Sequence, residues 1–193
     1  MAPQDDLPTL FFASASEWEA WLEREHERAA GLWMKIAKRG APRAGVSYSE
    51  ALDVALCFGW IDGRKAALDS HHWLQRLTPR GPRSRWSQIN RDRAQALIDA
   101  GRMRPAGHAQ IERARADGRW EAAYPGARAA TVPEDLEAAL SANPAARASF
   151  DSLDGANRYA ILYRIHDARR PVTRAQRIAR FVEMLAAGER LHP

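Results

Sequence analysis

The stretch RLTPRGPRSRWSQINR, residues 76–91, concentrates positive charge where a helix is expected to begin. The N-terminus of a helix exposes free N–H groups and the positive end of the helix dipole, so anions bind there readily. Guanidinium groups add bidentate hydrogen bonds to phosphate or carboxylate. This pattern predicts an anion site. The alternative is a solvated basic loop whose arginines pair with acidic side chains of the N-terminal segment. The cations are Arg76, Arg80, Arg83, Arg85 and Arg91.

The stretch CFGWIDGRK, residues 57–65, places aromatic, acidic and basic side chains around two glycines. One interpretation is a helix-to-strand turn in which Gly59 takes a left-handed conformation and Trp60 returns to the core. The other makes Trp60 the wall of a pocket that carries Asp62 and Lys65 on its rim. A single carboxylate without a partner does not by itself indicate acid–base catalysis. We therefore predict no catalytic residue.

Together, the two stretches predict a pocket for a small anion between a β-hairpin and the helix that begins near Ser84. Three arginines would hold the anionic group, two tryptophans would wall the pocket, and polar side chains would orient the ligand. The predicted site residues are Trp60, Asp62, Lys65, Arg76, Thr78, Arg80, Arg83, Ser84, Trp86, Ser87 and Asn90.

Other residues that could do chemistry lack the partners that their chemistry needs. His71 and His72 are adjacent, and adjacent residues of a strand point to opposite faces, so they rarely share a metal ion. Cys57 is expected at the C-terminal end of a helix, where the dipole raises a thiol pKa, so we expect a buried structural thiol. The sequence contains neither GxGxxG nor GxxxxGK[ST], the loops that bind nucleotide phosphates. We predict no metal and no cofactor.

The composition is that of a folded protein that does not span a membrane. Of the 193 residues, 46% are hydrophobic, yet no apolar run approaches the ~18 residues that a spanning helix needs. The single cysteine excludes an internal disulfide. The first segment, MAPQDDLPTLFF, is acidic and lacks the cationic region of a secretory signal. We therefore expect a cytoplasmic protein.

Charge is distributed unevenly along the chain. The formal net charge is +5, but residues 1–30 carry a balance of −5 and residues 61–120 a balance of +7. Such a basic segment is compatible with an anion-binding face or with nucleic acid. Because 26 of the 29 cations are arginine, the basic character can also follow from genomic base composition. The high pI therefore does not by itself indicate nucleic-acid binding.

Hydrophobic periodicity and breaker residues predict a mainly helical α+β fold with a small antiparallel sheet of about three strands. Capping patterns are expected at Ser16 with Glu19, at Ser47 with Glu50, and at Thr173. Residues 1–125 would form an α+β core that carries the WIDG and TPRGPRSRW motifs, and residues 126–193 a helical segment packed on it. The strands are expected at 32–38, 61–69 and 71–80, and the helices at 16–31, 47–58, 84–101, 105–118, 133–142, 157–169 and 173–188.

Several long stretches resemble the YdeI/OmpD-associated, or bacteriocin-protection, family. They are SYSEALDVALCFGWIDGRKAALD, RLTPRGPRSRWSQINRDRAQALIDAGRMRPAG, ADGRW and RYAILYRIHDARRPVTRAQRIARFVEMLAAG. The resemblance implies a bacterial protein with a role in tolerance of bacteriocins or other antimicrobial stress, and the family name includes an outer-membrane porin as a partner. It implies no reaction, cofactor or catalytic residue.

Three functions remain open from the sequence. The first is a non-enzymatic stress or bacteriocin-protection protein that binds a small anionic ligand through the predicted pocket, with a protein partner as the alternative to such a ligand. The second is non-specific nucleic-acid binding through the basic segment, with affinity that falls steeply as salt rises. The third is an undescribed hydrolase or transferase that uses Asp62 with Lys65 or a histidine, which would require a deep pocket and a strongly shifted pKa.

Overall fold

The computed structural model describes residues 6–192, and these divide into two compact units. The N-terminal unit comprises residues up to 86 and residues 90–123, and the C-terminal unit comprises residues 87–89 and those from 124 onward. That the units are separate domains, the second packed on the first, stays a prediction. Residues 1–5, part of the segment that was expected not to be a secretory signal, lie outside the described range.

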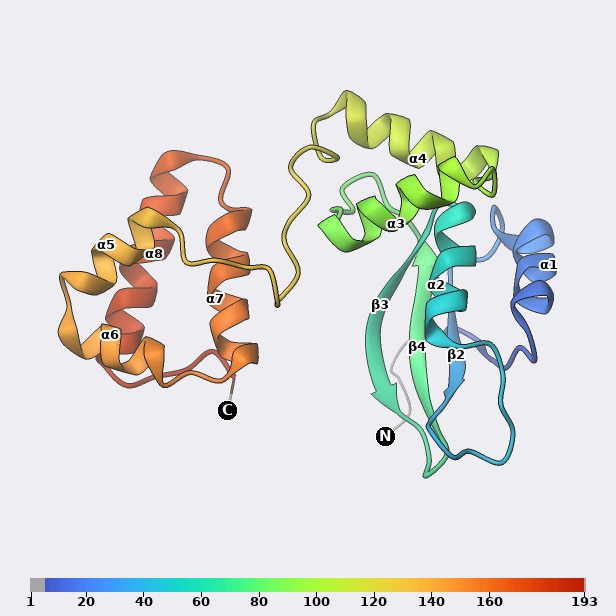
Figure 1. Ribbon diagram of the computed structural model, residues 1–193, viewed down its shortest axis with the longest axis horizontal. Helices are drawn as coiled ribbons and strands as arrows, with labels where there is room; N and C mark the ends of the chain where they lie inside the picture. The colour runs from blue at the N-terminus through green and yellow to red at the C-terminus, as the bar shows by residue number, and fades with distance from the viewer. Residues whose placement is uncertain (1–5, 193) are drawn as a thin grey trace. The chain divides into compact units, whose positions relative to one another are not determined.

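The N-terminal unit is built on a four-stranded sheet (Figure 1). The strands lie in the order β1-β2-β4-β3. They are β1 (Thr9–Leu10), β2 (Leu32–Ala37), β3 (Trp60–Ala67) and β4 (His72–Pro79). The helices that belong to this part of the chain are α1 (Ala15–Glu25), α2 (Tyr48–Cys57), α3 (Gln88–Asp99, its first two residues assigned to the other unit) and α4 (Pro105–Ala116).

The predicted α+β, mainly helical fold is confirmed, but the sheet differs from the prediction in two ways. It has four strands rather than three, because β1 adds a strand of two residues. Two residues are too short for the alternating pattern by which strands are recognised. β1 pairs with β2 in parallel, so the sheet is mixed rather than purely antiparallel.

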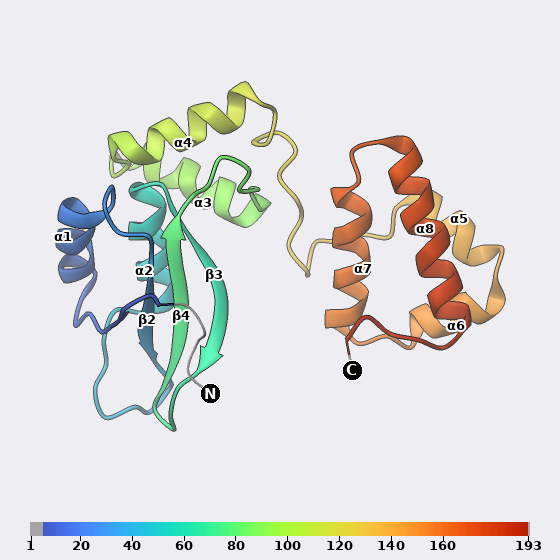
Figure 2. The same ribbon diagram turned by 180° about the vertical axis from the view of Figure 1, so that it is seen from behind.

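One face of the sheet is buried against helices. Figures 1 and 2 show α2 lying across this face, in front of the strands in one view and behind them in the other. Trp60 enters this core at 1% exposure and donates its indole N–H to the carbonyl of His26 at 3.2 Å. Its ring lies 6.0 Å from that of Trp18 and 5.9 Å from that of Trp21. Trp60 is therefore a core residue, as the helix-to-strand interpretation expected.

Serine caps begin both α1 and α2, but only one lies where the pattern places it. The capping box of Ser47 and Glu50 is present at α2, with both reciprocal hydrogen bonds. The predicted box of Ser16 and Glu19 is wrong, because α1 begins two residues earlier. There Ser14 Oγ accepts a hydrogen bond from the backbone N–H of Glu17 at 3.2 Å. The sequence SASE offers two serines, and the backbone of Ser14 is the extended one that a cap requires.

The C-terminal unit is a helical bundle around an apolar core of its own. Its last helix packs against the other three, and its apolar stripe of Ile178, Phe181 and Leu185 has helical spacing. The helices are α5 (Glu134–Ser141), α6 (Pro144–Asp151), α7 (Gly155–Asp167) and α8 (Pro171–Ala186).

Two sequence expectations for this unit are wrong. No helix was expected between residues 142 and 157, but Asn143 and Pro144 start α6. The Asn143 side chain accepts the N–H of Ala146 at 3.1 Å and Pro144 takes the first helical position, which suits a residue without an N–H. Thr173 does not cap α8, which begins at Pro171 for the same reason.

Candidate functional site

The register of the sheet separates the predicted site residues onto two faces. Asp62 pairs with Leu77 across β3 and β4, and directly opposite residues point to the same face. A bulge between Asp62 and Lys65 brings Lys65 to that face as well. Arg76 and Thr78 flank Leu77 and therefore point to the opposite face. These two pairs do not converge on one pocket, because the sheet lies between them.

Two arginine side chains hold the basic loop together, Arg80 from the loop itself and Arg119 from the segment that follows α4. Arg80 is 5% exposed and Trp86 is 2% exposed, and the guanidinium carbon lies 3.5 Å from the centre of the indole ring. Arg80 donates to the carbonyl of Arg85 at 3.1 Å, and Arg119 donates to the carbonyl of Ser84 at 2.6 Å. These contacts order the loop. Because both side chains are buried, they stabilise the conformation of the loop. That Arg80 and Trp86 also bind an anion stays a prediction.

The remaining predicted residues lie around this loop and the start of α3. Ser84 closes a turn, because its Oγ accepts from the N–H of Gly81 at 3.0 Å and its own N–H donates to the Gly81 carbonyl at 3.0 Å. Arg83 is exposed. Helix α3 begins at Gln88, directly after Ser87. Two cavities are described below, a pocket in the C-terminal unit and a shallow groove in the N-terminal unit. Neither of them is lined by any of the eleven predicted site residues.

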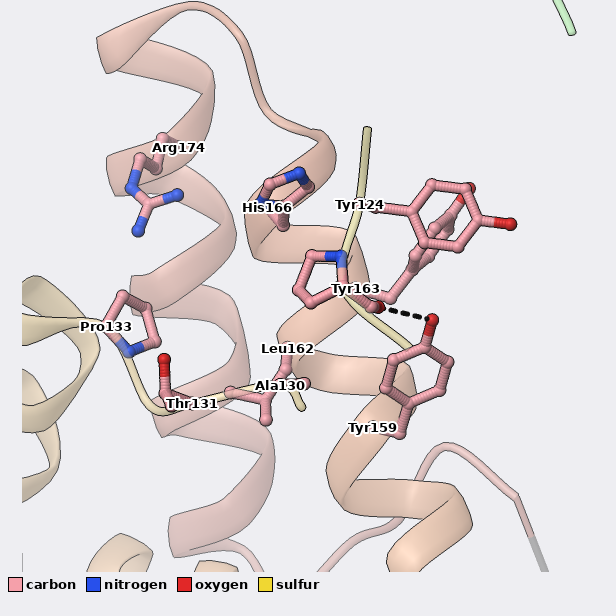
Figure 3. Close-up of a pocket in the computed structure, with 10 residues that line it drawn as sticks. Tyr124, Ala130, Thr131, Pro133, Tyr159, Leu162, Tyr163, His166 and Arg174 are labelled. Carbon is pink, nitrogen blue, oxygen red and sulfur yellow. Dashed lines mark hydrogen bonds between the residues drawn. The ribbon is translucent and has the colours of Figure 1, made fainter. Parts of the chain in front are cut away.

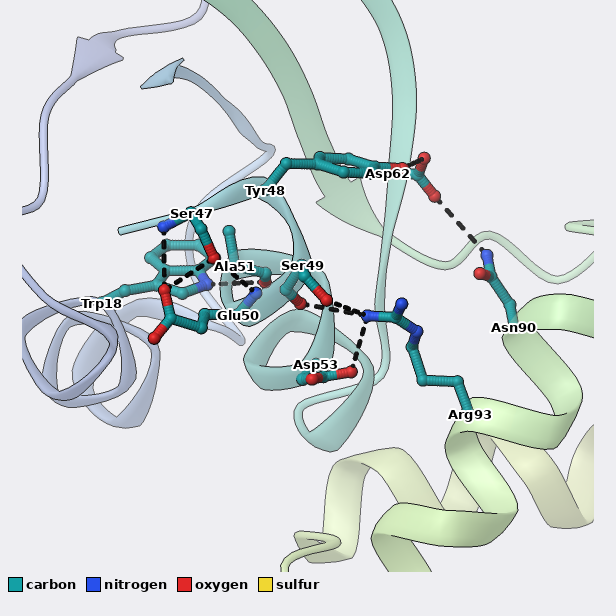
Figure 4. Close-up of polar contacts among 10 residues, drawn as sticks. All are labelled: Trp18, Ser47, Tyr48, Ser49, Glu50, Ala51, Asp53, Asp62, Asn90 and Arg93. Carbon is teal, nitrogen blue, oxygen red and sulfur yellow. Dashed lines mark hydrogen bonds and ion pairs between the residues drawn. The ribbon is translucent and has the colours of Figure 1, made fainter. Parts of the chain in front are cut away.

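Two of the predicted residues, Asp62 and Asn90, lie together in the N-terminal unit beside Tyr48, a residue that was not predicted (Figure 4). The hydroxyl of Tyr48 donates to Asp62 at 2.6 Å, and the Asn90 amide approaches the other oxygen of the same carboxylate at 3.5 Å. Lys65 lies 5.1 Å from the centre of the Tyr48 ring. Burial, followed by the hydrogen bond to Asp62, raises the pKa of Tyr48 well above its usual value.

Tyr48 is expected to make stability depend on alkaline pH. Its pKa is raised in the folded state, so its contribution is fully present below about pH 10, the ordinary tyrosine pKa, and is lost as pH rises toward the folded value. The difference in unfolding free energy between the wild type and Tyr48→Phe should therefore shrink above about pH 10. Urea unfolding of both proteins at several alkaline pH values measures it. A difference that does not change with pH would contradict the assignment.

A second candidate site is a pocket that lies entirely within the C-terminal unit (Figure 3). It has a volume of about 140 Å³. In Figure 3 three tyrosines form one side, and Arg174 with Pro133 lies on the other. The residues that line it are Tyr124, Pro125, Ala130, Thr131, Pro133, Tyr159, Leu162, Tyr163, His166 and Arg174.

Hydrogen bonds fix the polar groups of this tyrosine pocket. The hydroxyl of Tyr159 donates to the carbonyl of Pro125 at 3.1 Å, and burial raises the pKa of this phenol. Arg174 donates to both carboxylate oxygens of Asp135, at 2.5 and 2.8 Å, and to the carbonyl of Ile165 at 3.0 Å. A guanidinium has five N–H groups, so two remain for a ligand. The aromatic and cationic side chains are therefore held in place before a ligand arrives.

Sequence reasoning missed the tyrosine pocket because its wall comes from separate segments. Tyr124 precedes the helices, whereas Arg174 lies on α8, beyond Tyr159 and Tyr163 of α7. One signal was available. The two α7 tyrosines are four residues apart and so lie on one side of the helix.

Metal ligands, membrane-spanning helices and the single thiol are described for residues 6–192. No group of three potential metal ligands is found in residues 6–192. Within the same range, no helix has the length and apolarity to cross a membrane. Cys57 is buried, and burial raises its pKa to about 11, so the thiolate is scarce at neutral pH. A cytoplasmic location stays a prediction.

A shallow groove in the N-terminal unit is lined mainly by α1 and α4 residues, among them Glu23, His26 and Arg104.

Comparison with known proteins assigns each half of the chain to a family model. The model described as domain of unknown function (DUF8412) matches residues 10–110, more than half of the 193 residues. The chain belongs to this family. A second model, described as bacteriocin-protection, YdeI or OmpD-associated, matches residues 129–188. Neither a curated protein nor a solved structure gave a match.

The resemblance to the bacteriocin-protection family is confirmed in the C-terminal unit. The matched segment, residues 129–188, contains α5 to α8 and most of the tyrosine pocket. The stretches around WIDG and TPRGPRSRW, on which the resemblance also rested, fall instead within the part that the DUF8412 model matches. The chain is therefore a DUF8412 member that carries a YdeI/OmpD-associated domain.

Proposed function

We propose that this chain is a non-enzymatic binding protein of the bacteriocin-protection type, and that the tyrosine pocket of its C-terminal unit binds a small anionic aromatic ligand. The observation that carries the proposal is the pocket itself, which lies largely within the segment matched by the bacteriocin-protection model. The anionic ligand is the one predicted from the sequence. The site predicted at the basic loop stays a prediction, and we assign the anion to the tyrosine pocket because Arg80 is buried against Trp86.

The volume and the lining favour one aromatic ring with a small charged group. A cavity of roughly 150 Å³ holds a molecule the size of benzene, and this pocket has about 140 Å³. Tyrosine rings pack against an aromatic ligand edge to face or offset. Tyr124 and Tyr163 already meet in that way, with ring centres 4.9 Å apart and an angle of 83°.

The polar groups of the lining favour a negative charge on the ligand. Arg174 has two N–H groups beyond those that Asp135 and Ile165 accept, and His166 also lines the pocket. No acidic residue is among the ten lining residues. Asp135 balances part of the Arg174 charge, so hydrogen bonding rather than net charge would hold the ligand. The Tyr159 phenol, with its raised pKa, stays protonated at neutral pH and donates its single O–H to the carbonyl of Pro125, so it does not act as a base.

The proposal predicts saturable binding of benzoate, measured by isothermal titration calorimetry. Tyr163→Leu should weaken it about fivefold, because one aromatic contact contributes about 1 kcal/mol beyond its buried area. Cyclohexanecarboxylate, which has the charge without the aromatic ring, should bind more weakly to the wild type. The matched control is Tyr48→Leu, the same change in the N-terminal unit, which should leave benzoate affinity unchanged.

Three outcomes would contradict the proposal. They are no saturable binding of benzoate or of related aromatic acids, equal affinity in Tyr163→Leu, and equal loss in Tyr48→Leu. Binding of polyanions alone, abolished by moderate salt, would support non-specific nucleic-acid binding through residues 61–120 instead. The protective role is tested separately by the survival of bacteriocin-challenged cells that produce either the wild type or Tyr163→Leu.

A further inference from the structure

A lysine of the N-terminal unit lies against two aromatic rings on the sheet. The Nζ atom of Lys65 is 4.7 Å from the centre of the Trp73 ring and 5.1 Å from that of Tyr48. The two rings are 5.8 Å apart and inclined at 52°, so they form two walls of a corner. Asp62, which accepts the Tyr48 hydroxyl at 2.6 Å, adds a carboxylate beside it. We call these three residues, Tyr48, Trp73 and Asp62, the aromatic corner.

The position of the lysine follows from the strand pairing. Lys65 pairs with Gln75 and Ala67 pairs with Trp73, so Lys65 and Trp73 are diagonal neighbours on the same face. Tyr48, the first residue of α2, reaches the same place from the helical layer. Among the described residues, Lys65 makes no ion pair. Its ammonium group is held by the faces of aromatic rings.

We propose that the aromatic corner is a binding site for a small quaternary ammonium compound, and that Lys65 is its resident occupant. Aromatic faces beside a carboxylate are the surroundings that stabilise an alkylated ammonium ion. Lys65 shows that a cation is favoured at this position. A methylated ammonium is less strongly hydrated than a primary one, and it therefore loses less on leaving water for the rings.

Lys65 can give way to such a ligand. Its side chain is exposed and has a flexible four-carbon stem, and its contacts with the rings are of the weak kind found at exposed sites. The two ring positions are better fixed, because the Tyr48 hydroxyl is anchored on Asp62 and Trp73 lies within β4. A ligand would thus find the walls in place and would displace only the lysine. This site is in the N-terminal unit and does not depend on the function proposed for the tyrosine pocket.

The test is a titration with tetramethylammonium at constant ionic strength, followed by the NMR signal of the Trp73 indole N–H. Lys65→Ala should bind the probe about threefold more tightly than the wild type, because the competing occupant is removed. Lys38→Ala is the matched control, since Lys38 donates to the carbonyl of Asp69 instead, and its affinity should equal that of the wild type.

Two further variants show whether the aromatic faces are responsible. Tyr48→Phe keeps the ring and should keep most of the affinity, whereas Tyr48→Leu removes the ring and should lose binding. Circular dichroism establishes that each variant is folded. Because Lys65 is exposed, Lys65→Ala is not expected to alter the fold. Unchanged affinity in Lys65→Ala, or equal affinity in Tyr48→Phe and Tyr48→Leu, would overturn the proposal.

Discussion

Replacing Gly107 by alanine is expected to destabilise the N-terminal unit by about 3 kcal/mol. This is the opposite of the usual effect, since a glycine inside a helix is about 1 kcal/mol less favourable than alanine. Gly107 lies in α4, where that helix packs on the end of α2. A Cβ atom there would meet the carbonyl oxygens of Cys57 at 2.4 Å and Leu56 at 2.9 Å.

Neither carbonyl can move away without breaking another contact. The Cys57 carbonyl accepts the N–H of Arg104 at 3.1 Å, and the Leu56 carbonyl accepts the N–H of Gly59 at 3.1 Å. Gly59 has a φ of 71°, a left-handed conformation that ends α2 at this point. The third neighbour, the Met103 sulfur at 2.3 Å, belongs to a flexible side chain and can be displaced more easily. The two helices would therefore have to separate.

Urea unfolding followed by tryptophan fluorescence measures this effect. All seven tryptophans belong to the N-terminal unit, so the signal reports that unit alone. Gly155→Ala is the matched control, read by circular dichroism. Gly155 also lies in a helix, but its added Cβ would meet no atom within 4 Å beyond its chain neighbours and its own helix backbone, so stability should be unchanged or slightly raised. Equal effects of the two substitutions would show that α2 and α4 do not approach each other this closely.

Trp60→Ala is expected to have an effect of similar or larger size, about 4 kcal/mol of unfolding free energy. The indole is 1% exposed, meets the rings of Trp18 and Trp21, and donates its N–H to the carbonyl of His26. Truncation would leave a large cavity and an unpaired carbonyl. Both effects destabilise the folded state.

The same variant separates the two interpretations of Trp60. If Trp60 is a core residue, Trp60→Ala lowers the urea midpoint strongly and leaves benzoate affinity, measured below the transition, unchanged. Leu68→Ala is the control, because Leu68 is 42% exposed and its truncation should change stability by less than about 0.5 kcal/mol. A folded, nearly fully stable Trp60→Ala protein that lost affinity for an anion would support the pocket-wall interpretation instead.

Local patterns predicted much of the fold because their causes are local. Ser47 and Glu50 cap α2 through contacts three residues apart, and Gly59 ends it through a conformation that few other residues adopt. Patterns failed where two neighbouring solutions were equivalent, as with Ser14 and Ser16, or where an element was too short, as with β1. The parallel pairing of β1 depends on long-range contacts with β2 that no local pattern records.

The candidate sites divide in the same way. Residue types alone identified Asp62, Lys65 and Asn90 as candidate site residues. Their nearness in the sequence grouped them with Arg76 and Arg80 in one predicted anion pocket. The sheet separated that group, because a bulge between Asp62 and Lys65 sets which side chains share a face. Arg80 was predicted as a ligand-binding cation and lies buried over Trp86, since a guanidinium can stack on an indole as well as bind an anion.

By itself, the sequence determined the positions of most helices, three of the four strands, the caps that depend on neighbouring residues, and the resemblance of the C-terminal segment to its family. These properties arise from side chains within about one helical turn or strand of each other. Only the tertiary structure decided the tyrosine pocket and the aromatic corner. Tyr124 and Arg174 are fifty residues apart, and Tyr48 meets Trp73 only because α2 packs on the sheet. Their proximity follows from the packing of whole elements, which depends on the long-range burial of apolar surface.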